Sequence, residues 1–158
     1  MSRVFAAGGT GGGDDGETTV DKIEKFAGQH SFLSNFSDHP VTIDGETYPT
    51  SEHAFQALKT DDPAERAIVR AKDTPGKAKR AGKKVTLRPD WERARLGVME
   101  RVVRAKFEQH PEIAQKLQDT GETELIEGNS WNDTFWGVCR GKGKNKLGLL
   151  LMLIRSEL

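Results

Sequence analysis

The chain has very little cysteine and no long apolar run. Cys139 is the one cysteine in 158 residues, which excludes an internal disulfide and a cysteine-rich metal site. The longest apolar run, Leu147–Ile154, contains a glycine and is too short to span a bilayer. No long apolar stretch follows Arg3, so no signal peptide is predicted. We expect an intracellular protein with no membrane partner, placed in the cytoplasm with a nuclear location left open.

A net charge of one sign is also absent. The 24 Lys and Arg residues balance the 24 Asp and Glu residues. Proteins that bind long stretches of duplex through its phosphates carry a clear basic excess, so extended duplex binding is not indicated. Charged residues make up 30% and hydrophobic residues 35% of the chain, a composition typical of a globular protein of one domain. We expect this protein to be a monomer.

Residues 1–19 contain almost nothing apolar after Ala6, and we predict a disordered Gly-rich tail there. The glycine run Gly8–Gly13 is followed by neither Lys-Ser/Thr nor an amphipathic helix, so both nucleotide-loop templates fail. The folded domain is therefore predicted to cover residues 20–158.

The folded part predicts a mainly α protein with a small antiparallel β element. Asp44-Gly45 between two β-rich runs is a strong hairpin signal. Helix starts are marked by Ser, Thr or Asp caps and by proline in the first turn. The expected strands are 23–26, 41–43 and 46–48, and the expected helices are roughly 51–58, 63–71, 75–82, 90–107, 111–117 and 145–156. An aromatic-flanked turn is expected at 32–36 and irregular structure at 128–143.

The first candidate site lies on the helix predicted over 51–58. The spacing places Glu52, Phe55 or Gln56, and Lys59 on one face, and Phe55 favours an inward orientation. A carboxylate and an amine facing inward are costly unless they are paired or bind a ligand. The alternative is a glutamate that favours the helix dipole and a solvated lysine. No histidine has a second His or Cys at ligand spacing, so no metal site is predicted.

The second candidate is the segment 127–137, which holds two tryptophans among amide and acid side chains. This combination suits a nucleobase that stacks on an aromatic ring and is hydrogen-bonded at its edge. Asp133 could orient a ribose hydroxyl, act as a base, or offset positive charge at the sugar C1 carbon. The alternative is a structural turn anchored by tryptophan, in which Asp133 caps the backbone.

Two further segments could bind phosphates. The run Gly141-Lys-Gly-Lys-Asn145 precedes an apolar helix, and its backbone N–H groups could hold a pyrophosphate, although such basic turns are common on surfaces. A basic stretch precedes Trp91, and it is either a phosphate-binding face or a solvated helix face. Its members are Lys77, Lys79, Arg80, Lys83, Lys84 and Arg88.

Taken together, these segments resemble the NADAR family, also called YbiA-like. The resemblance covers the folded part in order and excludes the tail. The matching motifs are Phe32-Leu-Ser-Asn-Phe36, Tyr48-Pro-Thr-Ser-Glu-His-Ala-Phe-Gln-Ala-Leu-Lys59, Thr74-Pro75 with Ala78-Lys79, Arg88-Pro-Asp-Trp-Glu92, Val98-Met99, Lys106-Phe107, Thr120-Gly121, Asn132-Asp133, Phe135-Trp-Gly137, Gly141-Lys-Gly-Lys-Asn-Lys-Leu-Gly148, Leu151-Met152 and Ile154-Arg155.

The resemblance implies a compact, mostly helical domain with N-glycosidase activity and with neither metal nor cofactor. Family members act on ribosylamine intermediates of riboflavin synthesis, and others remove ADP-ribose from modified guanine. The resemblance places Glu52, Trp91 and Asp133 at active-site positions, and Lys59 or Lys79 at that of a lysine forming a Schiff base with the sugar. The segment 137–141 departs from relatives, which leaves substrate preference near it open.

The preferred hypothesis is a hydrolase that removes ADP-ribose from guanine in DNA, RNA or a free nucleotide. Glu52 would be the general acid/base and Asp133 would stabilise charge at C1, with either a lysine or water attacking. The alternatives are a hydrolase of the riboflavin-pathway ribosylamine and a module that binds ADP-ribose or NAD without turnover. Arg88 and the 141–145 run would hold phosphates, and Trp91 and Trp136 would stack on the substrate or shape its pocket. The predicted substrate-binding residues are Asn35, Phe36, Ser51, Arg88, Trp91, Asn132, Trp136, Gly137, Gly141, Gly143 and Asn145.

Overall fold

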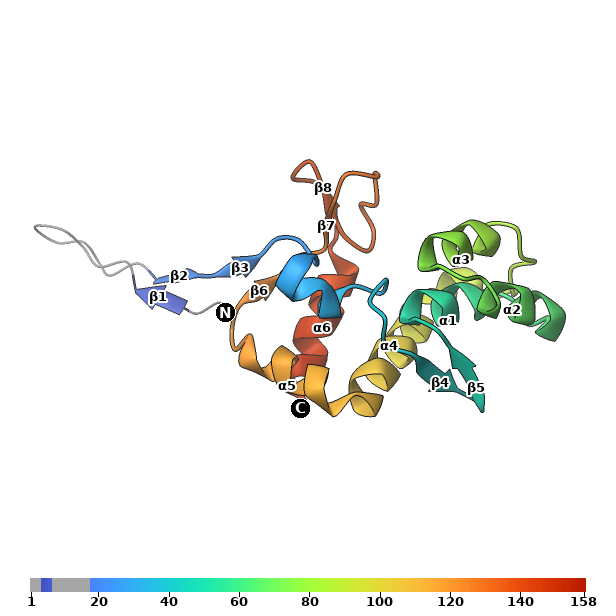
Figure 1. Cartoon of the computed structure of the whole chain (residues 1–158). Helices are drawn as coiled ribbons and strands as arrows, with labels where there is room; N and C mark the ends of the chain where they lie inside the picture. The colour runs from blue at the N-terminus through green and yellow to red at the C-terminus, as the bar shows by residue number, and fades with distance from the viewer. Residues whose placement is uncertain (1–3, 7–17) are drawn as a thin grey trace, which may run out of the picture. The chain divides into compact units, whose positions relative to one another are not determined.

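The computed structural model describes residues 4–6 and 18–158, which fall into two compact units (Figure 1). One unit combines the chain before Ser34 with Glu112–Leu158, and the other is Ser34–Pro111. Within the predicted tail, β1 (Val4–Ala6) and β2 (Thr18–Val20) pair as antiparallel strands, and the glycine run between them lies outside the described residues. In the described part of the chain, no helix is long and apolar enough to cross a membrane.

The Ser34–Pro111 unit begins with the predicted hairpin. Strands β4 (Val41–Ile43) and β5 (Glu46–Tyr48) pair antiparallel, with Val41 opposite Tyr48. The two turn residues, Asp44 and Gly45, have φ values of 52° and 81°, as the tight turn favoured by right-twisted hairpins requires. The hairpin prediction is confirmed.

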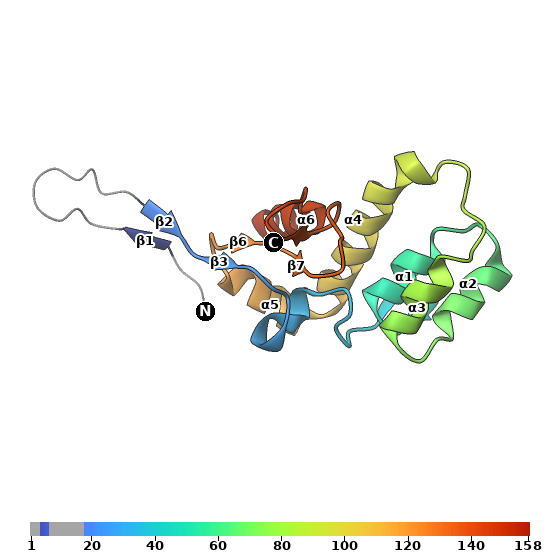
Figure 2. The same cartoon turned by 90° about the horizontal axis from the view of Figure 1, so that it is seen from above.

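Four helices follow in the same unit: α1 (Ser51–Ala57), α2 (Pro63–Arg70), α3 (Pro75–Gly82) and α4 (Trp91–Gln109). The side chains of Thr50, Asp62 and Thr74 accept backbone hydrogen bonds at the first three N-termini. Helix α1 packs against α2, α3 and α4, and Figure 2 shows it alongside α2 and α3. The core of the unit consists of Val41, Ile43, Tyr48, Ala54, Ala57, Leu58, Val69, Ala78 and Val102.

The other unit contains a short 3-10 helix, η1 (Gly28–Leu33), and two pairs of parallel strands. Strand β3 (Lys22–Ile23) pairs with β6 (Glu124–Leu125), and β7 (Gly128–Asn129) pairs with β8 (Val138–Cys139). Helix α5 covers Pro111–Asp119, and α6 (Lys146–Ser156) packs against β6. The buried hydrophobic side chains of this unit are Ile23, Phe32, Leu33, Ile113, Leu117, Leu125, Cys139, Leu147, Leu151 and Ile154.

The mainly α architecture with small β elements is confirmed, and the differences lie in the shortest elements. The strand predicted over 23–26 was wrong beyond Ile23, because β3 ends there. The predicted turn at 32–36 overlaps the end of η1, and the region 128–143 contains the β7–β8 pair. Strands of two residues are too short to show the alternation of apolar and polar side chains by which a strand is predicted.

Candidate active site

Glu52 and Gln56 lie one turn apart on α1 and are joined by a hydrogen bond. Gln56 Nε2 donates to Glu52 Oε2 at 2.7 Å, and the two residues are only 8% and 5% exposed. Gln56 Oε1 accepts no hydrogen bond from the described residues. A Cβ at Gly82 of α3 would lie 2.0 Å from this oxygen, so α3 approaches α1 closely because Gly82 has no side chain. The amide of Gln56 is therefore held between the carboxylate and α3.

Asn35 fixes the N-terminus of α1. Its backbone oxygen accepts a hydrogen bond from the N–H of Glu52 at 3.0 Å, and its Oδ1 accepts one from the hydroxyl of Ser51 at 2.9 Å. Asn35 Nδ2 also lies 3.3 Å from the sulfur of Met99 on α4. Asn35 and Ser51 were predicted to bind substrate, and here they set the position of the first turn, which carries Glu52.

Two aromatic rings, those of Phe55 and Trp91, form an aromatic wall beside the same helix. The rings of Phe55 and Trp91 lie 5.3 Å apart between centroids, and Trp91 is 7% exposed. Lys59 Nζ lies 5.9 Å from the centroid of the Phe55 ring. The carbonyl of Lys59 accepts a 2.8 Å hydrogen bond from the N–H of Arg88, which ties the end of α1 to the segment before α4. Lys59 is thus half-buried against aromatic rings.

The surroundings of Lys59 favour its neutral amine. Burial is the largest cause that lowers the pKa of Lys59, and the Glu52 carboxylate opposes this shift. The positive charges of Lys79 on α3 and of Lys83 at its C-terminal end lower the pKa of Lys59 further. Glu52 and Lys79 are therefore both close enough to Lys59 to interact with it electrostatically, and a catalytic role for these residues stays a prediction. A lysine with a lowered pKa is a better nucleophile at neutral pH.

Two other predicted residues of this unit have different surroundings. The guanidinium of Arg88 donates to both carboxylate oxygens of Asp90, at 2.7 and 3.0 Å, so a phosphate at Arg88 would compete with this pair. The ring of Phe36 is 45% exposed, which leaves it accessible to a ligand.

In the other unit, Asp133 caps the backbone of its loop. Its Oδ1 accepts hydrogen bonds from the N–H groups of Phe135 and Trp136, at 3.1 and 2.9 Å. Both bonds end on one oxygen, so among the described residues Oδ2 remains available to a ligand. Asn129 fixes the loop by bonding the backbone of Asp133 through both of its amide atoms. The structural alternative for Asp133 is therefore realised, and its catalytic role stays a prediction.

The remaining predicted residues of this loop form close backbone contacts. A Cβ at Gly137 would lie 1.8 Å from Glu127 Oε2, and one at Gly143 would lie 2.1 Å from the Gly137 carbonyl. Asn145 uses its side chain to accept from Glu127 N and to donate to the carbonyl of Leu125. These contacts explain the residue types structurally, and binding of substrate here stays a prediction.

The rest of the loop is more open. Asn132 is exposed and has a positive φ of 68°, and its Oδ1 accepts from Arg140 Nη1 at 2.8 Å. Gly141 is exposed, also with positive φ, and nothing lies within 4 Å of its Cβ position. The Trp136 ring packs edge-on against Phe135, with centroids 4.8 Å apart. Asn132 and Gly141 therefore sit where a ligand could reach them.

Lys106 of α4 is a buried lysine to which the sequence analysis gave no role. It is 1% exposed, and its Nζ donates to the carbonyl of Ser34 at 2.8 Å. Burial lowers the pKa of Lys106 to about 7. Ser34 precedes Asn35, so Lys106 supports the segment that holds Glu52. Lys106 lies four residues after Val102, which is buried, so helical spacing places both on the same buried face of α4.

The sequence is similar to a protein family and to several named proteins. The NADAR domain model matches residues 23–158. The chain is 40% identical over 145 residues to N-glycosidase YbiA of Escherichia coli, which covers 90% of each chain. It is 41% identical over 133 residues to a riboflavin biosynthesis protein of Vibrio vulnificus, covering 82% of this chain but 36% of that protein.

Structural similarity extends over most of the chain. The NMR structure of the Escherichia coli protein YbiA matches with a TM-score of 0.77 and 40% identity, covering 86% of this chain and 82% of that one. The family match spans both compact units, including the α1 residues and the tryptophan-rich loop. The chain belongs to the NADAR family.

Proposed function

We propose that this protein removes ADP-ribose from ADP-ribosylated guanine by hydrolysing the bond between the ribose C1 and the base. The coarser assignment rests on identity: the chain is an N-glycosidase of the NADAR family, 40% identical over 90% of its length to a named N-glycosidase. The observation that carries the chemistry is the electrostatic interaction of a buried carboxylate on α1, Glu52, with Lys59, which follows the end of α1 and whose pKa is lowered.

In the proposed reaction, Lys59 Nζ attacks C1 with its lone pair. The C1–N bond breaks, and its electron pair leaves with the base, which takes a proton from Glu52. Opening of the ribose ring gives an imine between Lys59 and C1. Water then adds to the imine carbon and gives a proton to the Glu52 carboxylate, and the amine leaves, which restores both Glu52 and Lys59 and releases ADP-ribose. Direct attack of water on C1 is the rival route, and it needs no covalent bond to lysine.

Gln56 and the aromatic wall support this role. The Gln56 amide fixes one oxygen of Glu52, so the other keeps a defined direction. Phe55 excludes water from one side of Lys59, and the neighbouring rings of Phe55 and Trp91 offer a flat surface to a base or ribose.

A second substrate is favoured by one comparison. The Vibrio vulnificus relative is named for riboflavin biosynthesis, which makes a ribosylamine intermediate of that route the alternative substrate. Its scissile bond is also an N-glycosidic bond at C1, so the same residues could act on it.

The test incubates the purified protein with an oligonucleotide that carries ADP-ribosylated guanine and, separately, with the riboflavin-pathway ribosylamine. Wild type, Glu52→Gln and Lys59→Met are compared with Glu92→Gln, a control that neutralises an exposed carboxylate of α4. We expect release of ADP-ribose by wild type and by the control, with a loss of about a hundredfold or more in the two site variants.

Three results would contradict the proposal. Cleavage of the ribosylamine alone would favour the alternative substrate. Tight binding of ADP-ribose by all four proteins without release from either compound would indicate a binding module. Full activity of both Glu52→Gln and Lys59→Met would exclude the α1 site.

A further inference from the structure

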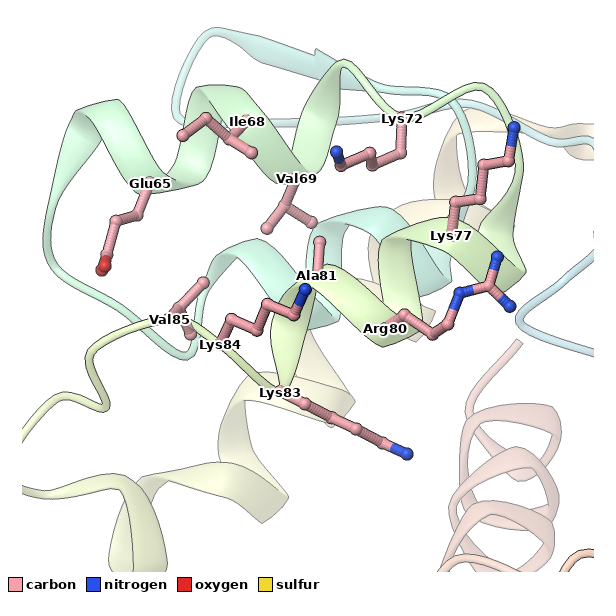
Figure 3. A pocket seen from close by; sticks show the side chains of 10 residues that line it. All are labelled: Glu65, Ile68, Val69, Lys72, Lys77, Arg80, Ala81, Lys83, Lys84 and Val85. Carbon is pink, nitrogen blue, oxygen red and sulfur yellow. The ribbon is translucent and has the colours of Figure 1, made fainter.

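A basic cavity of about 720 Å³ lies between α2 and α3 in the Ser34–Pro111 unit (Figure 3). Its centre is apolar: Val69 is fully buried, and Ala81 and Val85 pack partly against the core. Figure 3 shows Val69 and Ala81 between the side chains of Lys72 and Lys84. This volume falls within the range of small-molecule sites and is sufficient for a nucleotide.

The charge of the cavity is almost all positive and mostly unpaired. Five cationic side chains line it, and of these only Lys77 forms an ion pair, at 3.0 Å from Asp73. The other four have no ion pair with any residue of the described chain: Lys72, Arg80, Lys83 and Lys84. Clustered cations repel one another, so a bound anion would relieve this repulsion.

The single acid of the cavity does not neutralise these cations. Glu65 accepts hydrogen bonds from the hydroxyl of Thr60 at 2.6 Å and from Thr86, through its N–H at 2.9 Å and its hydroxyl at 3.1 Å. In Figure 3 its carboxylate points away from the amines of Lys72 and Lys84. Glu65 therefore joins α2 to the segment after α3 and leaves the cationic side of the cavity available.

The shape and composition favour one kind of anion. A solvated basic helix face is convex and presents no apolar floor, whereas this cavity is concave and Ile68 at its rim is 57% exposed. Phosphodiester groups alternate with sugars and bases along a nucleic acid strand, so cations and an apolar surface are both satisfied. An acidic peptide would satisfy the cations through carboxylates, but its sequence need not alternate charge with apolar groups, whereas every nucleotide of a strand carries both.

The cavity and the candidate active site lie against two different faces of α3. Lys83 lines the cavity, and its charge acts on Lys59 at the end of α1. Residues 77, 80, 81 and 84 follow helical spacing toward the cavity, whereas Gly82 faces Gln56 of α1. A strand held in the cavity therefore passes one edge of the site that carries Glu52 and Lys59.

We infer that the cavity between α2 and α3 binds the phosphodiester backbone of a nucleic acid strand next to the nucleotide whose base is cleaved. The inference rests on the proposed function, because it assigns the substrate of that site to a nucleic acid strand. Base-specific contacts are not required for it, and the cations supply affinity without sequence preference.

Fluorescence anisotropy with a labelled, unmodified single-stranded oligonucleotide tests this inference. The cavity variant is Lys72→Gln/Arg80→Gln/Lys84→Gln in the full chain. The matched control, Lys25→Gln/Arg93→Gln/Lys116→Gln, removes the same charge from exposed positions outside the cavity. We expect the cavity variant to bind about tenfold more weakly or worse, and the control to bind within about threefold of wild type. For three phosphate contacts, the slope of log affinity against log salt is about −2 for wild type.

A second readout separates this inference from the proposed function. With ADP-ribosylguanosine as substrate, kcat/KM should be the same for wild type and the cavity variant. With an oligonucleotide that carries ADP-ribosylated guanine, the cavity variant should have a lower kcat/KM than wild type, because its KM is higher. If no ADP-ribosylated guanine is cleaved but the oligonucleotide binds in the cavity, the proposed function fails and the binding inference stands.

Three outcomes would overturn the inference. Equal loss of binding in the cavity variant and the control would mean that net charge alone attracts the strand. Polyglutamate that competes as well as the oligonucleotide at equal charge would indicate an acidic protein partner. Absence of oligonucleotide binding by wild type at low salt would exclude a strand-binding cavity. Circular dichroism and thermal unfolding of both variants check that neither has lost its fold.

Discussion

The amide of Gln56 lies between the carboxylate of Glu52, to which it is hydrogen-bonded, and Gly82 of α3, so the position of a candidate catalytic acid depends on a glycine in another helix. Gln56 Nε2 lies 2.7 Å from Glu52 Oε2, and the Cβ position of Gly82 lies 2.0 Å from Gln56 Oε1. This contact connects the packing of α1 on α3 to the geometry of the site.

The contact predicts that Gly82→Ala lowers activity without touching substrate. The added methyl would meet Gln56 Oε1 at 2.0 Å and its Cβ at 2.9 Å, so the Gln56 side chain must move and its hydrogen bond to Glu52 is disturbed. We expect kcat/KM to fall by about tenfold to a hundredfold and the free energy of unfolding to fall by about 1–3 kcal/mol. The control is Gly76→Ala in the same helix, where nothing lies within 4 Å of the Cβ position. Equal kinetics of both variants and wild type would show that the contact does not position Glu52.

The charge of Lys83 predicts a shift in the pH profile. Lys83 lowers the pKa of Lys59, so Lys83→Gln should raise that pKa. The attacking species is the neutral amine, and the rising limb of kcat/KM against pH should therefore move to higher pH, with a lower rate at pH 7. A small substrate, ADP-ribosylguanosine, keeps strand binding out of the measurement. A profile that stays in place would argue against Lys59 as the group that titrates.

Lys106 predicts a pH-dependent stability. Burial lowers its pKa from 10.5 to about 7 in the folded protein. Between these pH values the unfolded chain holds a proton that the folded chain has released, so stability rises as pH rises through this window. Denaturant unfolding of wild type and Lys106→Met should show a stability difference that moves in favour of wild type above about pH 7, by up to about 1.4 kcal/mol per pH unit. A difference that does not change with pH would contradict a lowered pKa.

Asp133 offers a way to separate a structural role from a chemical one. Asp133→Asn keeps an oxygen that can accept from the N–H groups of Phe135 and Trp136, whereas Asp133→Ala removes it. We expect the alanine variant to lose about 1 kcal/mol of stability and the asparagine variant to lose little. Both should lose turnover if the charge acts at C1. An asparagine variant with full kcat would leave Asp133 with only its capping role.

The helices could be predicted because their starts carry local signals. Ser, Thr or Asp caps were expected at these starts, and the side chains of Thr50, Asp62 and Thr74 each accept a backbone hydrogen bond there. The Asp44-Gly45 turn is equally local, since two residues with positive φ determine it. The parallel pairs β3–β6 and β7–β8 could not be predicted, because parallel partners are joined by long connections and each strand here has two residues.

The candidate site was predictable along one helix but not across helices. Helical spacing placed Glu52 and Lys59 on one face, and the structure gives both the expected inward environment. The Gln56–Gly82 contact and the buried amine of Lys106 arise from packing between elements distant in sequence, for which one sequence holds no local signal. The basic stretch before Trp91 left a solvated face and a phosphate site equally open, and only the cavity between α2 and α3 favours the second.

The proposed attack of Lys59 on the ribose C1 can be tested by trapping the covalent intermediate. The protein is incubated with ADP-ribosylguanosine in the presence of borohydride, which reduces an imine to a stable amine, and the modified peptide is located by mass spectrometry. We predict a sugar adduct on Lys59, none in Lys59→Met, and an unchanged adduct site in Lys79→Met. An adduct on Lys79, or efficient turnover by wild type and Lys59→Met with no adduct on any lysine, would contradict the account.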